Sequence, residues 1–262
     1  MSRVLPGLAL AGCWLLLLLQ GSFLLFSLVM VLVAFLGGRE YTRMVLPSSF
    51  VGWRGYALAT LITLPVLCAA SGGRLPVAGG LLVSFFIVAA YILYRYNTID
   101  EPYQLFSGVV FGLVYVGVLT AHLVLLHRLE HGHLWLIVLT AITAGSDTGA
   151  YYAGRRFGSH KLCPGISPKK TVEGAVGGLA GGLVCALFFG WLMLPGVNVL
   201  FLTGVALLLV VVGIGGDLTE SVLKRAHGIK DSGTLLAGHG GILDRTDSLL
   251  FAGPVLYYLL LI

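Results

Sequence analysis

Charged residues are scarce in this chain of 262 residues, in which Lys, Arg, Asp and Glu together make up only 10% of the sequence. A soluble domain carries about 25% charged and about 45–50% apolar residues, whereas 58% of this chain is hydrophobic and its mean hydropathy is +0.97. An ordinary soluble domain is therefore excluded. The long apolar runs do not alternate, which disfavours a transmembrane barrel. They predict an all-α fold, a polytopic transmembrane helical bundle.

Several familiar motifs are also missing. The chain contains no GxxxxGK[ST], GxGxxG, GxSxG or HExxH string, so motor ATPases, dinucleotide enzymes and metalloproteases of those types are not supported. The four cysteines have no metal-type spacing, and disulfides are not expected. We find no repeat, linker or soluble domain, and expect one membrane domain over residues 1–262. The first apolar run lacks a small-residue cleavage site, which predicts an uncleaved helix.

The apolar runs predict the membrane topology. A spanning helix needs about 20 mostly apolar residues, and about nine such spans fit. They cover roughly residues 4–19, 22–38, 55–71, 76–94, 105–126, 133–153, 173–194, 198–219 and 244–261. With the N-terminus in the cytoplasm, 14 of the 16 Lys and Arg residues lie on the cytoplasmic side, and only Arg74 and Arg128 lie outside. Because the basic residues sit in loops between spans, we expect no nucleic-acid partner.

Acidic residues are distributed unevenly. Residues 1–140 contain four, and residues 141–247 contain the other seven. We therefore expect residues 1–140 to be mainly scaffold and lipid contact, and residues 141–262 to be the catalytic half.

The richest stretch runs from Ser221 to Asp247 and combines both signs of charge with five glycines. Asp244 and Asp247, three residues apart, share one helix face, and Asp217 lies at the end of the preceding span. These three acids are predicted to converge on one cation, and oxygen ligands suit Mg²⁺ or Mn²⁺. The alternative is salt bridging between helices, with Lys224, Arg225 and Arg245 as partners. We favour the metal site because the acids, the bases and the glycine-rich loop occur together.

A second candidate site extends from Asp147 to Gly178. A carboxylate in a span is costly, so Asp147 needs a metal or a basic partner. Ser167 and Pro168 are interpreted as a turn or helix cap, with the helix starting near Lys169 or Thr171. Lys169, Lys170 and a helix N-terminus would form a phosphate cradle. The alternative is a basic loop attracted to anionic lipid.

Histidines offer weaker signals. His239 lies between glycines, and it is either a hydrogen-bond donor to a phosphate or only a turn residue. The HRLEHGH cluster of residues 127–133 is predicted to face the outer side. Metal binding is one interpretation of that cluster, and an ordinary membrane interface is the favoured one.

Residues 221–247, of the form S-V-L-K-R-x4-K-D-x-G-x2-L-x2-H-G-G-I-x-D-R-T-D, closely resemble the signature of the phosphatidate cytidylyltransferases, or CDP-diacylglycerol synthases. The strings AYYAGRRFG, HKLCPGISPKKTVEG and GDLTES also look like that family, so the resemblance covers about the last 120 residues. Ala237 departs from the Pro or Gly that the family usually has two residues before the motif histidine. The resemblance implies an integral inner-membrane enzyme that moves CMP from CTP onto phosphatidate. It also implies dependence on Mg²⁺ and allows a homodimer.

Roles for individual residues follow as hypotheses, with the active site facing the cytoplasm of a bacterium. Asp217, Asp244 and Asp247 are assigned to Mg²⁺, and Asp147 is a further ligand or an orienting group. The residues expected to contact CTP phosphates or pyrophosphate are Lys224, Arg225, Lys230, Arg245 and His239. The remaining substrate-binding candidates are Ser167, Lys169, Lys170, Ser221, Asp231, Gly240 and Gly241, and Lys169 and Lys170 bind either CTP or phosphatidate.

Two other functions compete with cytidylyl transfer. Acids near spans broken by glycines are typical of ion-coupled transporters. The charges here gather at one membrane face and no internal duplication is present, which disfavours a transporter. The second alternative is a CTP-dependent lipid kinase of related architecture.

Overall fold

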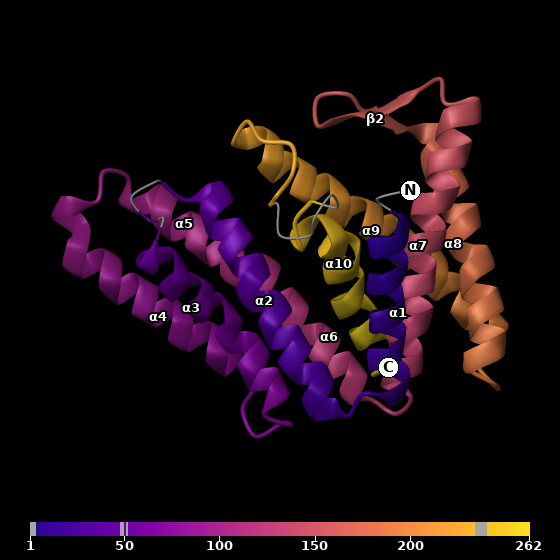
Figure 1. Cartoon of the computed structure of the whole chain (residues 1–262), viewed down its shortest axis with the longest axis horizontal. Coiled ribbons are helices and arrows are strands. Elements are labelled where there is room, and N and C mark those ends of the chain that lie inside the picture. The colour runs from indigo at the N-terminus through magenta and orange to yellow at the C-terminus, as the bar shows by residue number, and fades with distance from the viewer. Residues whose placement is uncertain (1–3, 48–49, 51, 234–239) are drawn as a thin grey trace.

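The computed structural model describes residues 4–47, 50, 52–233 and 240–262, and Figure 1 shows that they form a bundle of long helices. The elements are α1 (Val4–Gln20), α2 (Phe23–Val45), α3 (Trp53–Ala70), α4 (Val77–Arg95), the 3₁₀ turn η2 (Tyr96–Thr98), α5 (Pro102–Gly112), the π-helical segment η3 (Leu113–Val118), α6 (Leu119–Arg128), α7 (Gly132–Phe157), β1 (Lys161–Cys163), β2 (Ser167–Thr171), α8 (Val172–Met193), α9 (Val199–Ala226) and α10 (Leu243–Leu259).

The predicted all-α membrane bundle is confirmed as a fold class. Because α5, η3 and α6 follow one another without a break, the described residues form nine helical rods near the nine predicted spans. Six of these rods are long and apolar enough to cross a membrane. The other three are α1 and α10, which have 17 residues each, and α7, which includes polar residues such as Asp147.

The segment between α7 and α8 differs from the prediction. Ser167 and Pro168 lie on strand β2, which pairs antiparallel with β1 in a two-stranded hairpin. The interpretation of Ser167 and Pro168 as a turn or cap is therefore wrong. Thr171 caps α8 instead, because its hydroxyl accepts a hydrogen bond from the backbone N–H of Gly174 at 3.0 Å. The sequence did not indicate this hairpin, because its two short strands have no alternation of apolar and polar residues.

Helices α7 and α8 pack backbone against backbone. A methyl group on Gly145 would lie 2.8 Å from the backbone oxygen of Gly181, and one on Gly177 would lie 2.8 Å from that of Gly149. Small residues let membrane helices approach in this way. This close pair holds the hairpin at its end, as the labels α7, α8 and β2 in Figure 1 show.

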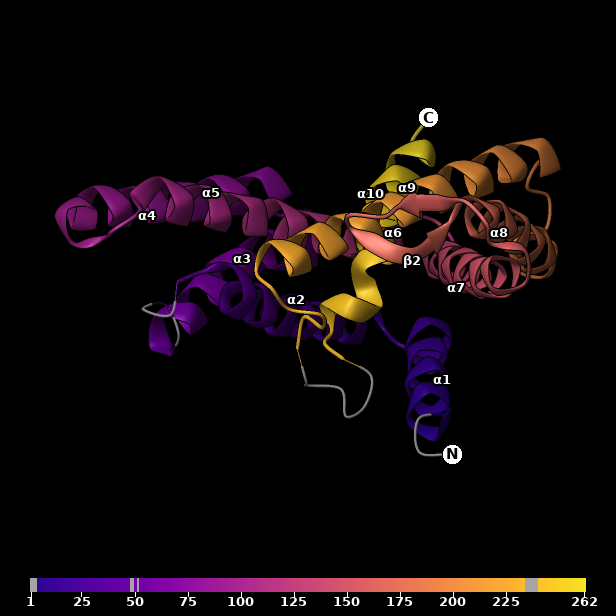
Figure 2. The ribbon, with the colours of Figure 1, turned by 90° about the horizontal axis from the view of Figure 1, so that it is seen from above.

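The charged segments meet at one end of the bundle. In Figure 1 the hairpin, the end of α9 and the start of α10 lie toward the top, whereas the C-terminus lies toward the bottom. Figure 2, seen from above, places α10 and α6 between the group that contains α3, α4 and α5 and the group that contains α7 and α8. The largest buried side chains, among them Tyr41, Tyr115 and Ile62, fill the interior of the bundle.

Candidate active site

Helices α9 and α10 are in close contact beside the charged residues. A methyl group on Gly216 would lie 2.6 Å from the backbone oxygen of Asp247. Ser248 donates its hydroxyl to the carbonyl of Gly213 at 3.2 Å. The glycines of α9 thus allow α10 to approach. The contact brings Asp217 and Asp247 onto neighbouring helices.

Three carboxylates from three helices lie near this contact. Asp147 of α7, Asp217 of α9 and Asp247 of α10 lie within electrostatic range of one another. Lys170 of β2 forms an ion pair with Asp217, with 2.5 Å between nitrogen and oxygen. The charge of Arg245 also acts on Asp147. The structure therefore brings together five of the predicted site residues from β2, α7, α9 and α10.

Asp244 has a different environment. Its Oδ1 accepts a hydrogen bond from Lys224 at 2.7 Å. Its Oδ2 accepts from the backbone N–H of Ser232 at 2.9 Å, from the Ser232 hydroxyl at 3.0 Å and from the N–H of Gly241 at 2.8 Å. Both oxygens are thus occupied by protein donors. The interhelical salt bridge that was the alternative to metal binding is present here, and the metal role of Asp244 stays a prediction.

Lys224 lies between two acids. Besides Asp244, it contacts Glu220 at 2.9 Å, and the Glu220 side chain is fully buried. The Oε1 of Glu220 has no hydrogen-bond partner among the described residues. The sequence places Glu220 on the Asp217 face, but no role was predicted for it. The sequence did contain an indication of this role, because a carboxylate buried in an apolar helix requires a cationic partner.

The remaining predicted residues surround these two groups. Arg225 donates to the carbonyl of Ile166 at 3.4 Å, which connects α9 to the hairpin. Ser221 donates to Asp217 at 3.5 Å. Exposed positions are occupied by Lys169, Lys230 and Asp231, and Ser167 is half-buried on β2. Gly240 has φ +81°, a conformation that favours glycine. His239 and Ala237 lie outside the described residues.

A carboxylate of the N-terminal half also reaches this region. Glu40, near the end of α2, is 3% exposed and accepts hydrogen bonds from the backbone N–H groups of Ile242 and Leu243, both at 3.0 Å. Glu40 is one of the four acids of residues 1–140, and no function was predicted for it. Its position at the end of an apolar run was the signal that pointed to a buried role.

The carboxylates match the chemistry of a hard divalent cation. Oxygen ligands alone suit Mg²⁺ or Mn²⁺, and a cation would relieve the repulsion among Asp147, Asp217 and Asp247. Among the described residues, no three His, Cys, Asp or Glu side chains form a ready-made metal cluster. This finding includes the predicted HRLEHGH cluster, where the His127 ring stacks on Phe26 with centroids 4.2 Å apart.

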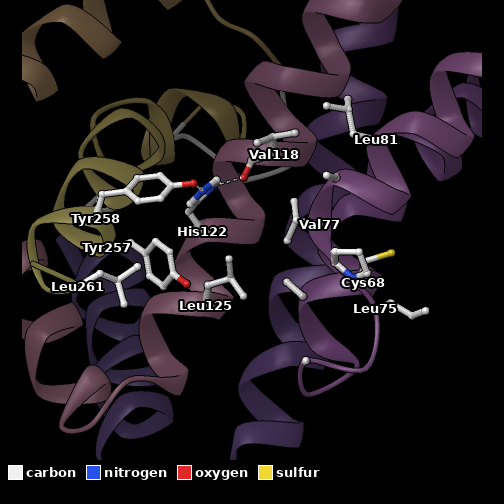
Figure 3. A pocket seen from close by; sticks show the side chains of 14 residues that line it. Cys68, Leu75, Val77, Leu81, Val118, His122, Leu125, Tyr257, Tyr258 and Leu261 are labelled. Carbon is white, nitrogen blue, oxygen red and sulfur yellow. Dashed lines mark hydrogen bonds between the residues drawn. The ribbon is translucent and has the colours of Figure 1, made fainter.

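A cavity of about 480 Å³ lies elsewhere in the bundle. Its walls come from α3, α4, the α5–α6 rod and the end of α10. Figure 3 shows His122 pointing toward the hydroxyl of Tyr258, at 3.3 Å, with mostly apolar side chains around the pair. None of the predicted site residues lines this cavity, which is therefore separate from the charged groups.

Comparison with known proteins places the chain in a family. The model of the cytidylyltransferase family matches residues 1–262. The chain belongs to this family. It is 38% identical over 178 residues to the phosphatidate cytidylyltransferase of Bacillus subtilis (strain 168), which covers 66% of each chain. It is 35% identical over 247 residues to the protein of the same name from Staphylococcus saprophyticus, covering 93% of this chain and 92% of the relative.

A third relative, the phosphatidate cytidylyltransferase of Staphylococcus aureus (strain COL), is 40% identical over 184 residues, which are 69% of this chain and 68% of the relative. The resemblance carried by residues 221–247 is thus confirmed. Neither the ion-coupled transporter nor the lipid kinase is supported by these comparisons.

Proposed function

We propose that this membrane enzyme transfers the cytidylyl group of CTP to phosphatidate, giving CDP-diacylglycerol and pyrophosphate for phospholipid synthesis. The observation that carries the proposal is the match of residues 1–262 to the cytidylyltransferase family. Relatives that cover most of the chain are named for phosphatidate as the acceptor. The gathering of acids and bases at one end of the bundle is the arrangement that such a reaction needs.

The chemistry explains why cations dominate the site. A phosphate oxygen of phosphatidate attacks the α-phosphorus of CTP, and the bond from this phosphorus to the bridging oxygen of the β-phosphate breaks. The attacking oxygen is already anionic at neutral pH, so no strong general base is required. The barrier comes from bringing two polyanions together and from charge on the departing pyrophosphate.

We propose that the basic residues bind and neutralise the negative charge of the substrates and of pyrophosphate. Arg245, Arg225 and Lys230 contact the phosphates of CTP or the pyrophosphate. Lys170 exchanges its carboxylate partner Asp217 for a substrate phosphate when the substrates bind. Lys224 is held between Glu220 and Asp244, so its charge acts on the site from a fixed position.

The acids are proposed to hold the metal. Asp217 and Asp247 would bind Mg²⁺, with Mn²⁺ as a substitute, and Asp147 would be a further ligand or an orienting group. Bound Mg²⁺ supplies charge that neutralises the phosphates. Asp244 was assigned to the metal as well, but its four protein donors favour a role in holding the loop before α10.

We also propose a cellular location and an orientation in the membrane. The charged end of the bundle faces the cytoplasm of a bacterium, the protein spans its inner membrane nine times, and the N-terminus is cytoplasmic. The distribution of Lys and Arg supports this orientation. CTP then arrives from the cytoplasm, and phosphatidate enters laterally between helices. A homodimer, which the family resemblance allows, stays a prediction.

The test uses purified protein in detergent micelles with phosphatidate, Mg²⁺ and CTP. Label at the cytidine ring or α-phosphate is expected in the lipid fraction, and label at the γ-phosphate is expected in pyrophosphate. Transfer of the γ-label to lipid would indicate the kinase instead. No labelled lipid from either position would refute cytidylyl transfer.

A further inference from the structure

Glu40, a residue of α2, caps the N-terminus of α10. Its Oε1 accepts from the N–H of Ile242, and its Oε2 accepts from the N–H of Leu243, each at 3.0 Å. The first N–H groups of a helix have no partner within it and need an external acceptor. Ile242, the N-cap of α10, makes no side-chain capping bond. A carboxylate about 200 positions earlier in the chain therefore supplies the cap that the local sequence does not.

The same carboxylate holds the loop between α9 and α10. The Ser232 hydroxyl lies 3.4 Å from Oε2 of Glu40 and 3.0 Å from Oδ2 of Asp244. Glu40 and Asp244 thus share one hydroxyl group. Asp244 also accepts from the N–H groups of Ser232 and Gly241. The two acids therefore hold Ser232, which follows α9, and Gly241, which precedes α10.

Two glycines of the motif are explained by this carboxylate. A methyl group on Gly233 would lie 2.5 Å from Oε1 of Glu40, and one on Gly241 would lie 2.5 Å from Oε2. A side chain at either position would require the Glu40 carboxylate to shift from the place where it accepts from Ile242 and Leu243. Glycine at both sites allows the backbone of Gly233 and Gly241 to lie against the carboxylate of Glu40, a residue that is 3% exposed.

We propose that Glu40 is a positioning residue for the reaction. By capping α10, it sets the direction in which the first turn of that helix presents Asp244, Arg245 and Asp247 to the acids of α7 and α9. The first 140 residues thereby contribute to the arrangement of the active site. This inference rests on the proposed function, since the consequence is a change in cytidylyl transfer.

The test compares Glu40→Gln with the wild-type protein in detergent micelles. Gln keeps the volume and one acceptor oxygen but turns an NH₂ group toward a backbone N–H. We expect kcat to fall about tenfold, the equivalent of losing one hydrogen bond to a charged group. The KM for CTP should stay within about twofold, because the proposal gives Glu40 the role of holding α10 and not of binding substrate. Glu40→Asp, which keeps the charge but is shorter, should recover part of kcat.

Hydrogen exchange gives a readout that does not depend on activity. In peptides covering residues 240–246, the amides of Ile242 and Leu243 should exchange about tenfold faster in Glu40→Gln than in the wild type. Exchange in residues 250–256 should not change. The matched control is Glu130→Gln, whose side chain is 92% exposed. It should leave kcat and exchange at the wild-type values.

The outcomes separate the two proposals. A wild-type protein that makes no labelled lipid overturns the proposed function, whatever the exchange results are. If the wild type is active and a monodisperse Glu40→Gln variant keeps the wild-type kcat, the positioning role of Glu40 is wrong. Unchanged exchange at Ile242 and Leu243 would also overturn it. A lower thermal midpoint with an unaltered kcat indicates only a structural role and likewise counts against the proposal.

Discussion

Lys224 of α9 and Asp244 of α10 form an ion pair at 2.7 Å across the loop that joins their helices. The ammonium group contacts Glu220 on its other side at 2.9 Å, and the exposed fractions of the Lys224, Asp244 and Glu220 side chains are 13%, 11% and 0%. One largely enclosed cation therefore contacts two carboxylates, of which Glu220 is fully buried. The residue pattern that indicated phosphate binding also includes this internal ionic contact.

Replacing Lys224 with Met should destabilise the protein strongly. The change leaves Glu220 and Asp244 buried without their cation, and breaking a buried pair costs about 3–5 kcal/mol. We expect a lower thermal midpoint in detergent and loss of cytidylyl transfer. Lys161→Met, at an exposed position on β1, is the control and should leave the midpoint unchanged. Equal midpoints for the two variants would show that the Lys224 contacts contribute no stability.

Lys170→Ala should change substrate affinity more than stability. Lys170 is half-buried and pairs with Asp217, which is one of the acids assigned to Mg²⁺. If Lys170 binds a substrate phosphate, its removal should raise the KM for either CTP or phosphatidate about tenfold, as expected for a lost charge-assisted hydrogen bond. Steady-state kinetics with each substrate varied in turn distinguish the two. Unchanged KM values for both substrates would remove Lys170 from the site.

The helices and the meeting of the charged segments could be predicted because both depend on local patterns. Apolar runs separated by short polar segments predict the helical rods. The concentration of charge near Asp217 and Asp247 predicts where chemistry takes place. Glycines at positions 213 and 216 mark the place where α10 approaches α9.

The partners of individual charges could not be predicted in the same way. Asp244 and Asp247 lie three residues apart, yet only Asp244 accepts from Ser232 and Gly241. That difference depends on how the loop folds back. The hydrogen bond from Leu243 to Glu40 joins residues 203 positions apart. A local sequence pattern cannot predict a contact between residues so far apart in the chain. The hairpin was missed because β1 and β2 have only three and five residues.

Gly177→Ala should destabilise the pair formed by α7 and α8. A methyl group at Gly177 would overlap the Cβ of Ala153 and lie 2.8 Å from the backbone oxygen of Gly149. Overpacking of this kind costs about 1–3 kcal/mol. The matched control is Gly204→Ala in α9, where nothing lies within 4 Å of the added methyl group. Thermal unfolding of the two variants in one detergent should give a lower midpoint for Gly177→Ala only, and equal midpoints would contradict close packing of these helices.

Asp247→Asn should weaken binding of the divalent cation and lower kcat. The substitution keeps the size of the side chain but removes a negative charge from the group formed with Asp147 and Asp217. At saturating Mg²⁺ we expect kcat to fall by about 100-fold or more, as for other losses of electrostatic stabilisation at a reacting phosphate. Mg²⁺ should also raise the thermal midpoint of the wild type but not of the variant, because a ligand stabilises only a protein that binds it. Asp100→Asn, at an exposed position before α5, should behave like the wild type in both measurements. Near-normal turnover of Asp247→Asn, with an intact Mg²⁺-dependent shift, would show that Asp247 is not a metal ligand.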